Sequence, residues 1–164
     1  MKYLIFGIIL MTVIGKKIYD VSNAINDEFD LYFQRSGERN NIDPNLIKAL
    51  GLNESWLGKY KNEVVVNGEA TSGIMHLELP TARDYVSNIS RDDLLKPENE
   101  IEIATKHFKW LLGQTNNNLD HAVRAYNGGI GRLREYLRGE APDIWVKNTN
   151  EYLERFKRNL ERLS

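Results

Sequence analysis

The segment that begins at Asp43, Asp-Pro-Asn-Leu-Ile-Lys-Ala-Leu-Gly-Leu-Asn-Glu-Ser, constrains the fold of this chain most strongly. Asp43 can cap the first turn of a helix, and Pro44 suits the first helical position. Ile47, Leu50 and Glu54 then fall on one helical face, so a carboxylate ends an otherwise apolar stripe. Because an ionised carboxylate is costly in apolar surroundings, such a glutamate tends to keep its proton, as a general acid must. From this helix alone, the alternative is a solvated glutamate near a frayed helix end.

Composition argues against several kinds of site. The 164 residues include no cysteine, so the chain has neither a thiol nucleophile nor a disulfide framework. The three histidines, His76, His107 and His121, lack the close spacing of a zinc-ligand pair, which argues against a zinc site. A formal net charge of −1 argues against a nucleic-acid binder that depends on bulk positive charge.

The first residues have the outline of a secretory signal. Lys2 precedes an apolar run over residues 3–14, and Lys16 and Lys17 follow it. The run is short for a spanning helix, which needs about 20 apolar residues. Because the lysines directly follow the potential cleavage site, an uncleaved signal anchor is as good an interpretation as a cleaved signal peptide. We therefore expect a signal anchor or signal peptide at residues 1–19, a linking helix at 20–37 and one domain at 38–164.

Hydrophobic periodicity predicts that this domain is mainly α, with at most a small β-hairpin. Three valines at residues 64–66, followed by an Asn-Gly pair, favour the hairpin. In a helix expected at residues 80–89, Ala82, Tyr85 and Val86 should face inward. The polar residues 37–41 predict a loop. Other helices are expected at residues 21–35, from 43 to 55, from Ser90, from Pro97 to about 113, at 119–128, at 130–137 and at 149–163.

Three segments carry side chains that could do chemistry. Glu54 is followed by Ser55, residues 73–76 read Gly-Ile-Met-His, and residues 125–129 read Ala-Tyr-Asn-Gly-Gly at an expected helix end. A tyrosine on the inner face just before two glycines can present its hydroxyl to a cleft, although a core aromatic is the alternative for Tyr126. His76 could likewise be a partly exposed turn residue.

In this order and at these separations, the three segments resemble the lysozyme-like catalytic domain of soluble lytic transglycosylases. The resemblance covers about residues 38–155. Residues 42–49 resemble the family's helix before its Glu-Ser pair, and residues 72–82 resemble its Gly-Leu-Met-Gln stretch. Residues 96–112 are similar to its Asp-Pro…Asn-Ile…Leu-Leu helix. Residues 125–129 match its Ala-Tyr-Asn-x-Gly signature, and Thr149 with Tyr152 resembles its C-terminal Thr-x-x-Tyr pair. Two departures stand out: His76 replaces the family's Gln, and the helix proline is displaced by one, to Pro80.

The resemblance implies a peptidoglycan lytic transglycosylase that cleaves the β-1,4 bond between N-acetylmuramic acid and N-acetylglucosamine and leaves a 1,6-anhydro product. Glu54 would act as general acid and then as general base, without a metal or cofactor. The alternatives are a hydrolytic muramidase, with Glu63, Glu69 or Glu78 as a second acid, and a non-catalytic peptidoglycan-binding assembly protein of the same fold. The residues expected to bind substrate are Ser55, Gly73, Met75, His76, Tyr126, Asn127 and Tyr152.

The resemblance also bears on partners and location. The long spacing between Glu54 and Gly73 is familiar in small transglycosylases of secretion and conjugation systems and in virion-borne ones. Expected partners are peptidoglycan glycan strands, the membrane through residues 1–19, and a phage virion or secretion-complex assembly, but no nucleic acid. We expect a membrane-anchored protein that acts in the periplasm or cell wall, with a virion-associated protein or one secreted after signal cleavage as the alternative.

Overall fold

The computed structural model describes residues 28–58, 64–66, 69–71 and 73–164. The segment predicted to be a signal anchor or signal peptide, residues 1–19, lies outside these ranges, as do residues 20–27 and the Asn-Gly pair at 67–68. Within the described ranges, none of the helices combines the length and the apolar character that crossing a membrane requires.

Helices make up most of the described chain, as the periodicity predicted, and one antiparallel strand pair accompanies them. In β1 and β2, Val66 lies opposite Glu69, so the predicted hairpin is confirmed for its two strands. The elements in chain order are α2 (Asp30–Asn40), α3 (Pro44–Ser55), β1 (Val64–Val66), β2 (Glu69–Thr71), α4 (Leu79–Arg83), α5 (Arg91–Leu94), α6 (Pro97–Gln114), α7 (Leu119–Gly128), α8 (Ile130–Leu137) and α9 (Asp143–Leu163).

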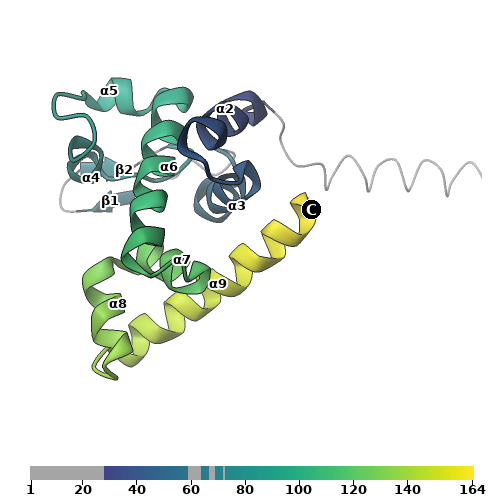
Figure 1. The fold of residues 1–164 in the computed structure, drawn as a ribbon. Helices are drawn as coiled ribbons and strands as arrows, with labels where there is room; N and C mark the ends of the chain where they lie inside the picture. Colours follow the sequence, from purple (N-terminus) through teal and green to yellow (C-terminus); the bar gives the residue numbers. More distant parts are fainter. Residues whose placement is uncertain (1–27, 59–63, 67–68, 72) are drawn as a thin grey trace, which may run out of the picture.

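The long helix α6 runs through the middle of the molecule (Figure 1). It packs against α2 and α7, while α3 packs against both α2 and α9. The fully buried side chains of Ile47, Leu50, Ile101, Phe108 and Phe156 come from α3, α6 and α9 and form the centre of the main core. The apolar stripe predicted for α3 is therefore confirmed.

The start and the end of α3 follow from its sequence. The Asp43 side chain accepts a 2.9 Å hydrogen bond from the backbone N–H of Asn45, and Pro44 is the first helical residue, as predicted. The helix ends because Trp56, Leu57 and Gly58 all have left-handed backbones, with φ of 52°, 55° and 80°. These signals fix Glu54 in the last turn of α3.

The loop predicted at residues 37–41 is wrong. α2 continues through Asn40, and only Asn41, with φ of 52°, closes it. A side chain at Gly37 would place its Cβ 2.7 Å from the Ile42 carbonyl oxygen and from the Pro44 ring, so this glycine permits the close approach of α3. The polar composition that suggested a loop instead serves contacts with α6.

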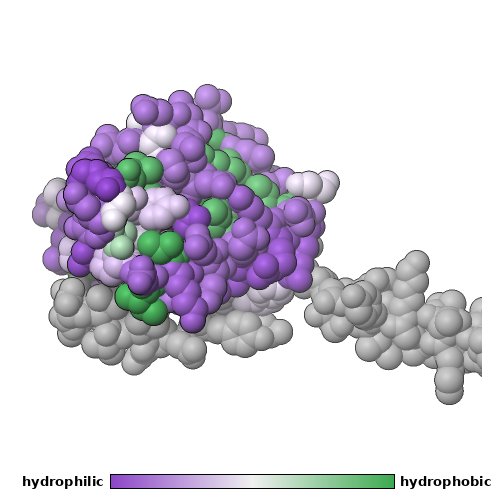
Figure 2. Space-filling view, turned by 90° about the horizontal axis from the view of Figure 1, so that it is seen from below, coloured by the Kyte–Doolittle hydropathy of each residue, from purple (hydrophilic) through white to green (hydrophobic). Residues whose placement is uncertain are grey.

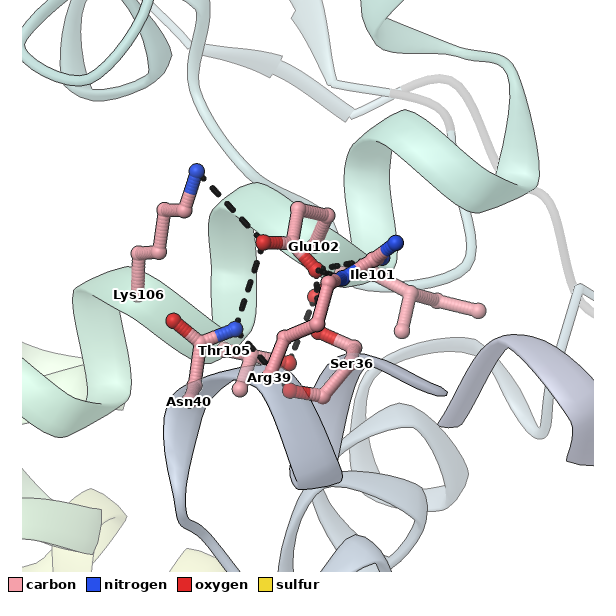
Figure 3. A network of polar contacts seen from close by, with 7 residues as sticks. All are labelled: Ser36, Arg39, Asn40, Ile101, Glu102, Thr105 and Lys106. Atoms are coloured by element: carbon pink, nitrogen blue, oxygen red, sulfur yellow. Dashed lines mark hydrogen bonds and ion pairs between the residues drawn. The ribbon is translucent and has the colours of Figure 1, made fainter. Parts of the chain in front are cut away.

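Glu102 of α6 supplies those contacts. Its carboxylate accepts hydrogen bonds from Ser36 at 2.8 Å, from Arg39 at 2.7 Å and from Asn40 at 3.2 Å (Figure 3). Burial alone would raise the pKa of Glu102, but these hydrogen bonds and the charge of Arg39 hold it below its ordinary value. The last turns of α2 are thus stabilised by a residue more than 60 positions away, which no local pattern reveals.

The helix predicted at residues 80–89 is shorter than expected. α4 ends at Arg83, and Ser90 then caps α5 as predicted. Ala82 is buried and Tyr85 is half-buried, but Val86 is 42% exposed, so its predicted inward orientation is wrong. The apolar residues of this segment form only a small cluster against α6, which a short helix is enough to cover.

The last helix begins at Asp143, before the predicted start at residue 149. Trp145 anchors the additional turns, because its indole Nε1–H donates a 2.8 Å hydrogen bond to the carbonyl of Gly128. A Cβ on Gly128 would lie 2.3 Å from that nitrogen, so the first glycine of the Gly-Gly pair lets α9 approach the end of α7. Figure 2 shows that a second view of the molecule is mainly hydrophilic, with only small hydrophobic areas among the coloured residues.

Candidate active site

Three of the sequence-predicted residues meet at the end of α3. The Glu54 side chain is 14% exposed, and its Oε1 accepts a 2.5 Å hydrogen bond from the Tyr152 hydroxyl of α9. Its other oxygen, Oε2, lies 3.4 Å from Nδ1 of His76, in the segment before α4. The carboxylate is therefore neither frayed nor freely solvated, because both of its oxygens have a neighbour from a distant part of the chain.

Glu54 opens onto a cavity of about 160 Å³. Asn127, at the end of α7, lines this cavity and also a second one of about 400 Å³ beside α9. A further cavity of about 370 Å³ lies between α2 and α6 and does not include Glu54, so size alone does not identify the site. The residues that line the Glu54 cavity are Glu54, His76, Leu77, Glu78, Thr81, His107, Tyr126 and Asn127.

The two tyrosines expected to bind substrate, Tyr126 and Tyr152, each donate a hydrogen bond within the protein. Tyr126 donates a 3.0 Å hydrogen bond to the backbone carbonyl of Met75, and Tyr152 makes the direct bond to Glu54. Burial, with the neighbouring Glu54 as the next cause, raises the pKa of both tyrosines well above 10. Both hydroxyls therefore keep their protons and act as fixed donors, Tyr152 to the carboxylate and Tyr126 to the loop beside it.

Ser55 and Met75 lie away from the cavity. The Ser55 side chain is buried; its hydroxyl donates to the carbonyl of Ile74 at 2.8 Å and accepts from the N–H of Gly58 at 2.7 Å. The Met75 side chain is fully buried in the main core, so it packs inward and does not form the expected wall of the groove. Both residues hold the 73–77 loop against α3.

Glu100, which sequence reasoning missed, lies beneath the same loop. It is 1% exposed, and its carboxylate accepts hydrogen bonds from the backbone N–H groups of Ile74 at 2.7 Å and Met75 at 3.1 Å. Burial raises the pKa of Glu100, although these hydrogen bonds oppose the shift. A Cβ on Gly73 would lie 2.2 Å from Oε1 of Glu100, so Gly73 permits this contact and does not face the cavity itself.

A signal for Glu100 was present in the sequence. It lies four residues before Ala104 and eight before Phe108, on the apolar face of α6, just as Glu54 ends the apolar face of α3. The same test that identified Glu54 would therefore have found it.

Two other residues that contribute to the candidate site, Asn53 and His107, had no local signal in the sequence. Asn53 donates a 2.9 Å hydrogen bond to the backbone carbonyl of Tyr152 and accepts one of 2.8 Å from Asn159, which fixes α9 next to Glu54. His107 lines the cavity, is hydrogen-bonded to Tyr85 at 3.1 Å, and has its pKa lowered by burial. These contacts join residues that only the fold brings together. Within the described ranges, no three His, Asp or Glu side chains gather as a metal site would require.

A family model described as the transglycosylase SLT domain matches residues 31–143. This chain belongs to that family. Soluble lytic murein transglycosylases of Salmonella typhimurium and Escherichia coli are each 33% identical to it over 128 residues, which is 74% of this chain. The chain spans only 18% of the length of these curated relatives.

Solved structures share the fold of this SLT domain. The 70 kDa soluble lytic transglycosylase of Escherichia coli matches 91% of the chain with a TM-score of 0.68 at 24% identity, over 26% of its own length. An inactive glutamate-to-glutamine mutant of the lytic transglycosylase Slt from Pseudomonas aeruginosa matches 83% of the chain with a TM-score of 0.67 at 19% identity, over 24% of its length. The predicted mainly α, lysozyme-like fold is thereby confirmed.

Proposed function

We propose that this SLT domain is a peptidoglycan lytic transglycosylase, with Glu54 as its single acid–base residue. The observation that carries the proposal is the Glu54 carboxylate itself, which is 14% exposed at a cavity and hydrogen-bonded by Tyr152. Relatives that are 33% identical over 128 residues are named soluble lytic murein transglycosylases, which supports murein as the substrate. The cavities that meet at Asn127 suit a polymeric ligand that passes Glu54.

The proposed reaction cleaves the β-1,4 bond between N-acetylmuramic acid and N-acetylglucosamine. Glu54 gives its proton to the glycosidic oxygen, and the C–O bond to the anomeric carbon of the muramic acid breaks. The resulting carboxylate then takes the proton of the 6-hydroxyl of the same sugar, whose oxygen bonds to the anomeric carbon and forms the 1,6-anhydro ring. Because the nucleophile belongs to the substrate, one carboxylate suffices, in contrast to glycosidases that use a pair.

The Tyr152 hydroxyl, which donates to Oε1 of Glu54, suits both the acid step and the base step of the proposed reaction. The Tyr152 hydroxyl, 2.5 Å from Oε1, stabilises the carboxylate that forms when the proton leaves, and it leaves Oε2 to exchange the proton. Tyr126 and Glu100 hold the loop that carries His76, so they position the wall of the cavity. Asn127, exposed in both cavities, is the residue we propose to contact the glycan strand directly.

A muramidase that hydrolyses the same bond is the second candidate. Glu78 favours it, because this exposed carboxylate lines the same cavity as Glu54 and could orient a water molecule. Of the other two acids considered, Glu63 lies outside the described residues, and Glu69 is described only as part of β2.

Mass spectrometry of the products from purified peptidoglycan distinguishes the two reactions. The proposal predicts fragments that end in 1,6-anhydro-N-acetylmuramic acid. Fragments with a reducing end, heavier by one water, would favour the muramidase. Intact peptidoglycan that merely retains the protein would favour a non-catalytic binding role.

We further propose that residues 1–19 direct the protein to a membrane or through it, so that the domain at 38–164 acts on the cell wall. The apolar run between Lys2 and Lys16 supports this proposal. The wall would then be opened locally for a phage or for a secretion or conjugation machine. The test is to express the full chain, separate the membrane fraction and sequence the N-terminus. A chain that retains Met1 in the membrane fraction supports an anchor, and a new N-terminus near residue 16 supports cleavage. An intact chain outside the membrane contradicts both.

A further inference from the structure

His76 has an unusual backbone for a residue with a side chain. Its φ of 47° lies in the left-handed region, which histidine enters more readily than most residues but still uncommonly. Such a conformation persists where the surrounding structure enforces it, and it often marks a functional constraint. Here the backbone just before His76 is held in place, because the N–H groups of Ile74 and Met75 donate to Glu100 and the Tyr126 hydroxyl donates to the Met75 carbonyl. The loop therefore aims the imidazole at Glu54.

The two ring nitrogens of His76 have different surroundings. Nδ1 lies 3.4 Å from Oε2 of Glu54. Nε2 is buried and has no hydrogen-bond partner within the part of the chain that the structure describes. A proton on Nε2 would bury an N–H donor without an acceptor, whereas a bare nitrogen there leaves only an unused lone pair. The surroundings therefore favour the neutral ring with its proton on Nδ1, directed at Glu54.

We propose that His76 is a positioning residue for Glu54, held in the Nδ1–H tautomer so that it donates to Oε2 when that oxygen has lost its proton. The inference rests on the proposed role of Glu54. The distance of 3.4 Å is longer than a hydrogen bond to an ionised carboxylate, and catalytic hydrogen bonds often tighten only when substrate is bound. With Tyr152 on Oε1 and His76 on Oε2, the carboxylate has one donor for each oxygen during the step in which it acts as a base.

The titratable side chains around the imidazole are Glu54 from α3, Glu78 from the loop, Glu100 and His107 from α6, Tyr126 from α7 and Tyr152 from α9. Glu78 and His107 line the same cavity and are retained in every variant below.

The kinetic test compares His76→Ala, His76→Gln and the control His121→Gln on soluble, uncrosslinked glycan strands from about pH 5 to pH 8. His76→Ala should lower kcat about 10- to 100-fold with little change in KM, because the carboxylate loses its fixed neighbour. His76→Gln should restore most of kcat at neutral pH, because an amide N–H can donate. An unchanged kcat in His76→Ala, or a His76→Gln variant as slow as His76→Ala, would overturn the proposal.

Nitrogen-15 NMR of the imidazole tests the tautomer without any catalysis. The spectrum of the full chain at neutral pH should show the Nδ1–H form for His76, with its signal assigned by its loss in His76→Gln. The Nε2–H form would contradict the proposal even in an active enzyme. Conversely, a wild-type chain that cleaves no peptidoglycan but shows the Nδ1–H form would refute the proposed function and not the geometry of His76. The two failures are therefore distinguishable.

Discussion

Glu100 and Glu102 stand two residues apart on α6, and their side chains reach different neighbours. Glu100 is 1% exposed beneath the 73–77 loop, and it accepts hydrogen bonds from backbone N–H groups. Glu102 is partly exposed and accepts from Ser36, Arg39 and Asn40 of α2. Burial raises the pKa of the first carboxyl, whereas hydrogen bonds and the Arg39 charge outweigh burial and lower the pKa of the second.

This difference separates a carboxylate that shapes the site from one that stabilises the scaffold. Backbone N–H groups orient Glu100, and through it the loop, but they do not offset the full cost of burying its charge. The guanidinium of Arg39 and the solvent near Glu102 make ionisation favourable there. Glu100 therefore lowers stability at neutral pH while it fixes the 73–77 loop. Glu102, on the side of α6 that faces α2, does not lower stability.

The largest expected effect comes from Gly73→Ala. The added Cβ would lie 2.2 Å from Oε1 of Glu100, so the carboxylate or the loop must move and both backbone hydrogen bonds suffer. We expect a loss of about 3–5 kcal/mol in the free energy of unfolding, measured by urea denaturation. Gly113→Ala is the matched control, because its Cβ would meet nothing within 4 Å and should be neutral or stabilise by up to about 1 kcal/mol. Equal effects for the two variants would refute the close contact.

Glu100→Ala should be somewhat less damaging. It leaves the N–H groups of Ile74 and Met75 buried without an acceptor, at roughly 1–3 kcal/mol each, but it also removes a buried charge. We expect a net loss of about 2–3 kcal/mol and lower activity, because the loop carrying His76 is released. Glu98→Ala, an exposed position in the same turn, should change stability by less than about 0.5 kcal/mol. A Glu100→Ala variant as stable as Glu98→Ala would remove the structural role given to this residue.

Glu102→Ala should cost about 1–2 kcal/mol, since the carboxylate is only partly buried and water can replace some of its partners. Peptidoglycan cleavage at neutral pH should stay close to that of the wild type. A loss of activity at unchanged stability would instead connect this network to the active site.

The two carboxylates should also respond to pH in opposite directions. The folded-state pKa of Glu100 is raised, so the contribution of its protonated form is present below the unfolded value of about 4.3 and is lost as pH rises through the folded pKa. The folded-state pKa of Glu102 is lowered, so its contribution is present above about 4.3 and is lost as pH falls through the folded pKa. Urea denaturation at several pH values should therefore show Glu100→Gln gaining stability relative to the wild type as pH rises, and Glu102→Gln losing it. Parallel pH profiles would contradict the comparison.

The smallest expected effect is that of Arg39→Ala. The Arg39 side chain is 59% exposed, so its 2.7 Å ion pair with Glu102 should contribute less than about 1 kcal/mol and fade as salt is added. Thermal unfolding at low and high ionic strength measures this. A contribution that is large and insensitive to salt would mean that the network around Glu102 excludes water.

The fold was most predictable where a helix carries its own start, face and end. The segment from Asp43 to Ser55 contains the capping residue and the apolar face of α3, and the left-handed residues 56–58 end the helix. The helix predicted at residues 130–137 forms α8 with those bounds. The last turn of α2 was not predictable, because its polar side chains donate hydrogen bonds to Glu102 of a distant helix. The early start of α9 depends on Trp145 meeting Gly128, and such a contact between distant residues leaves no period in the sequence.

The candidate site was likewise predictable from the sequence only in part. Motif spacing identified Glu54, His76, Tyr126 and Tyr152, but not which tyrosine bonds to Glu54. That depends on how α7 and α9 pack, because Tyr152 reaches the carboxylate and Tyr126 reaches the Met75 carbonyl. The resemblance also implied that Met75 binds substrate, whereas packing places its side chain in the core.

The account depends most directly on Glu54. The decisive measurement is the rate at which Glu54→Gln, with unchanged thermal unfolding, releases soluble fragments from purified peptidoglycan. The isosteric amide can still accept from Tyr152 but cannot give a proton to the glycosidic oxygen, so we predict a rate at least about 100-fold below that of the wild type. A Glu54→Gln variant that digests peptidoglycan as fast as the wild type would contradict the assignment.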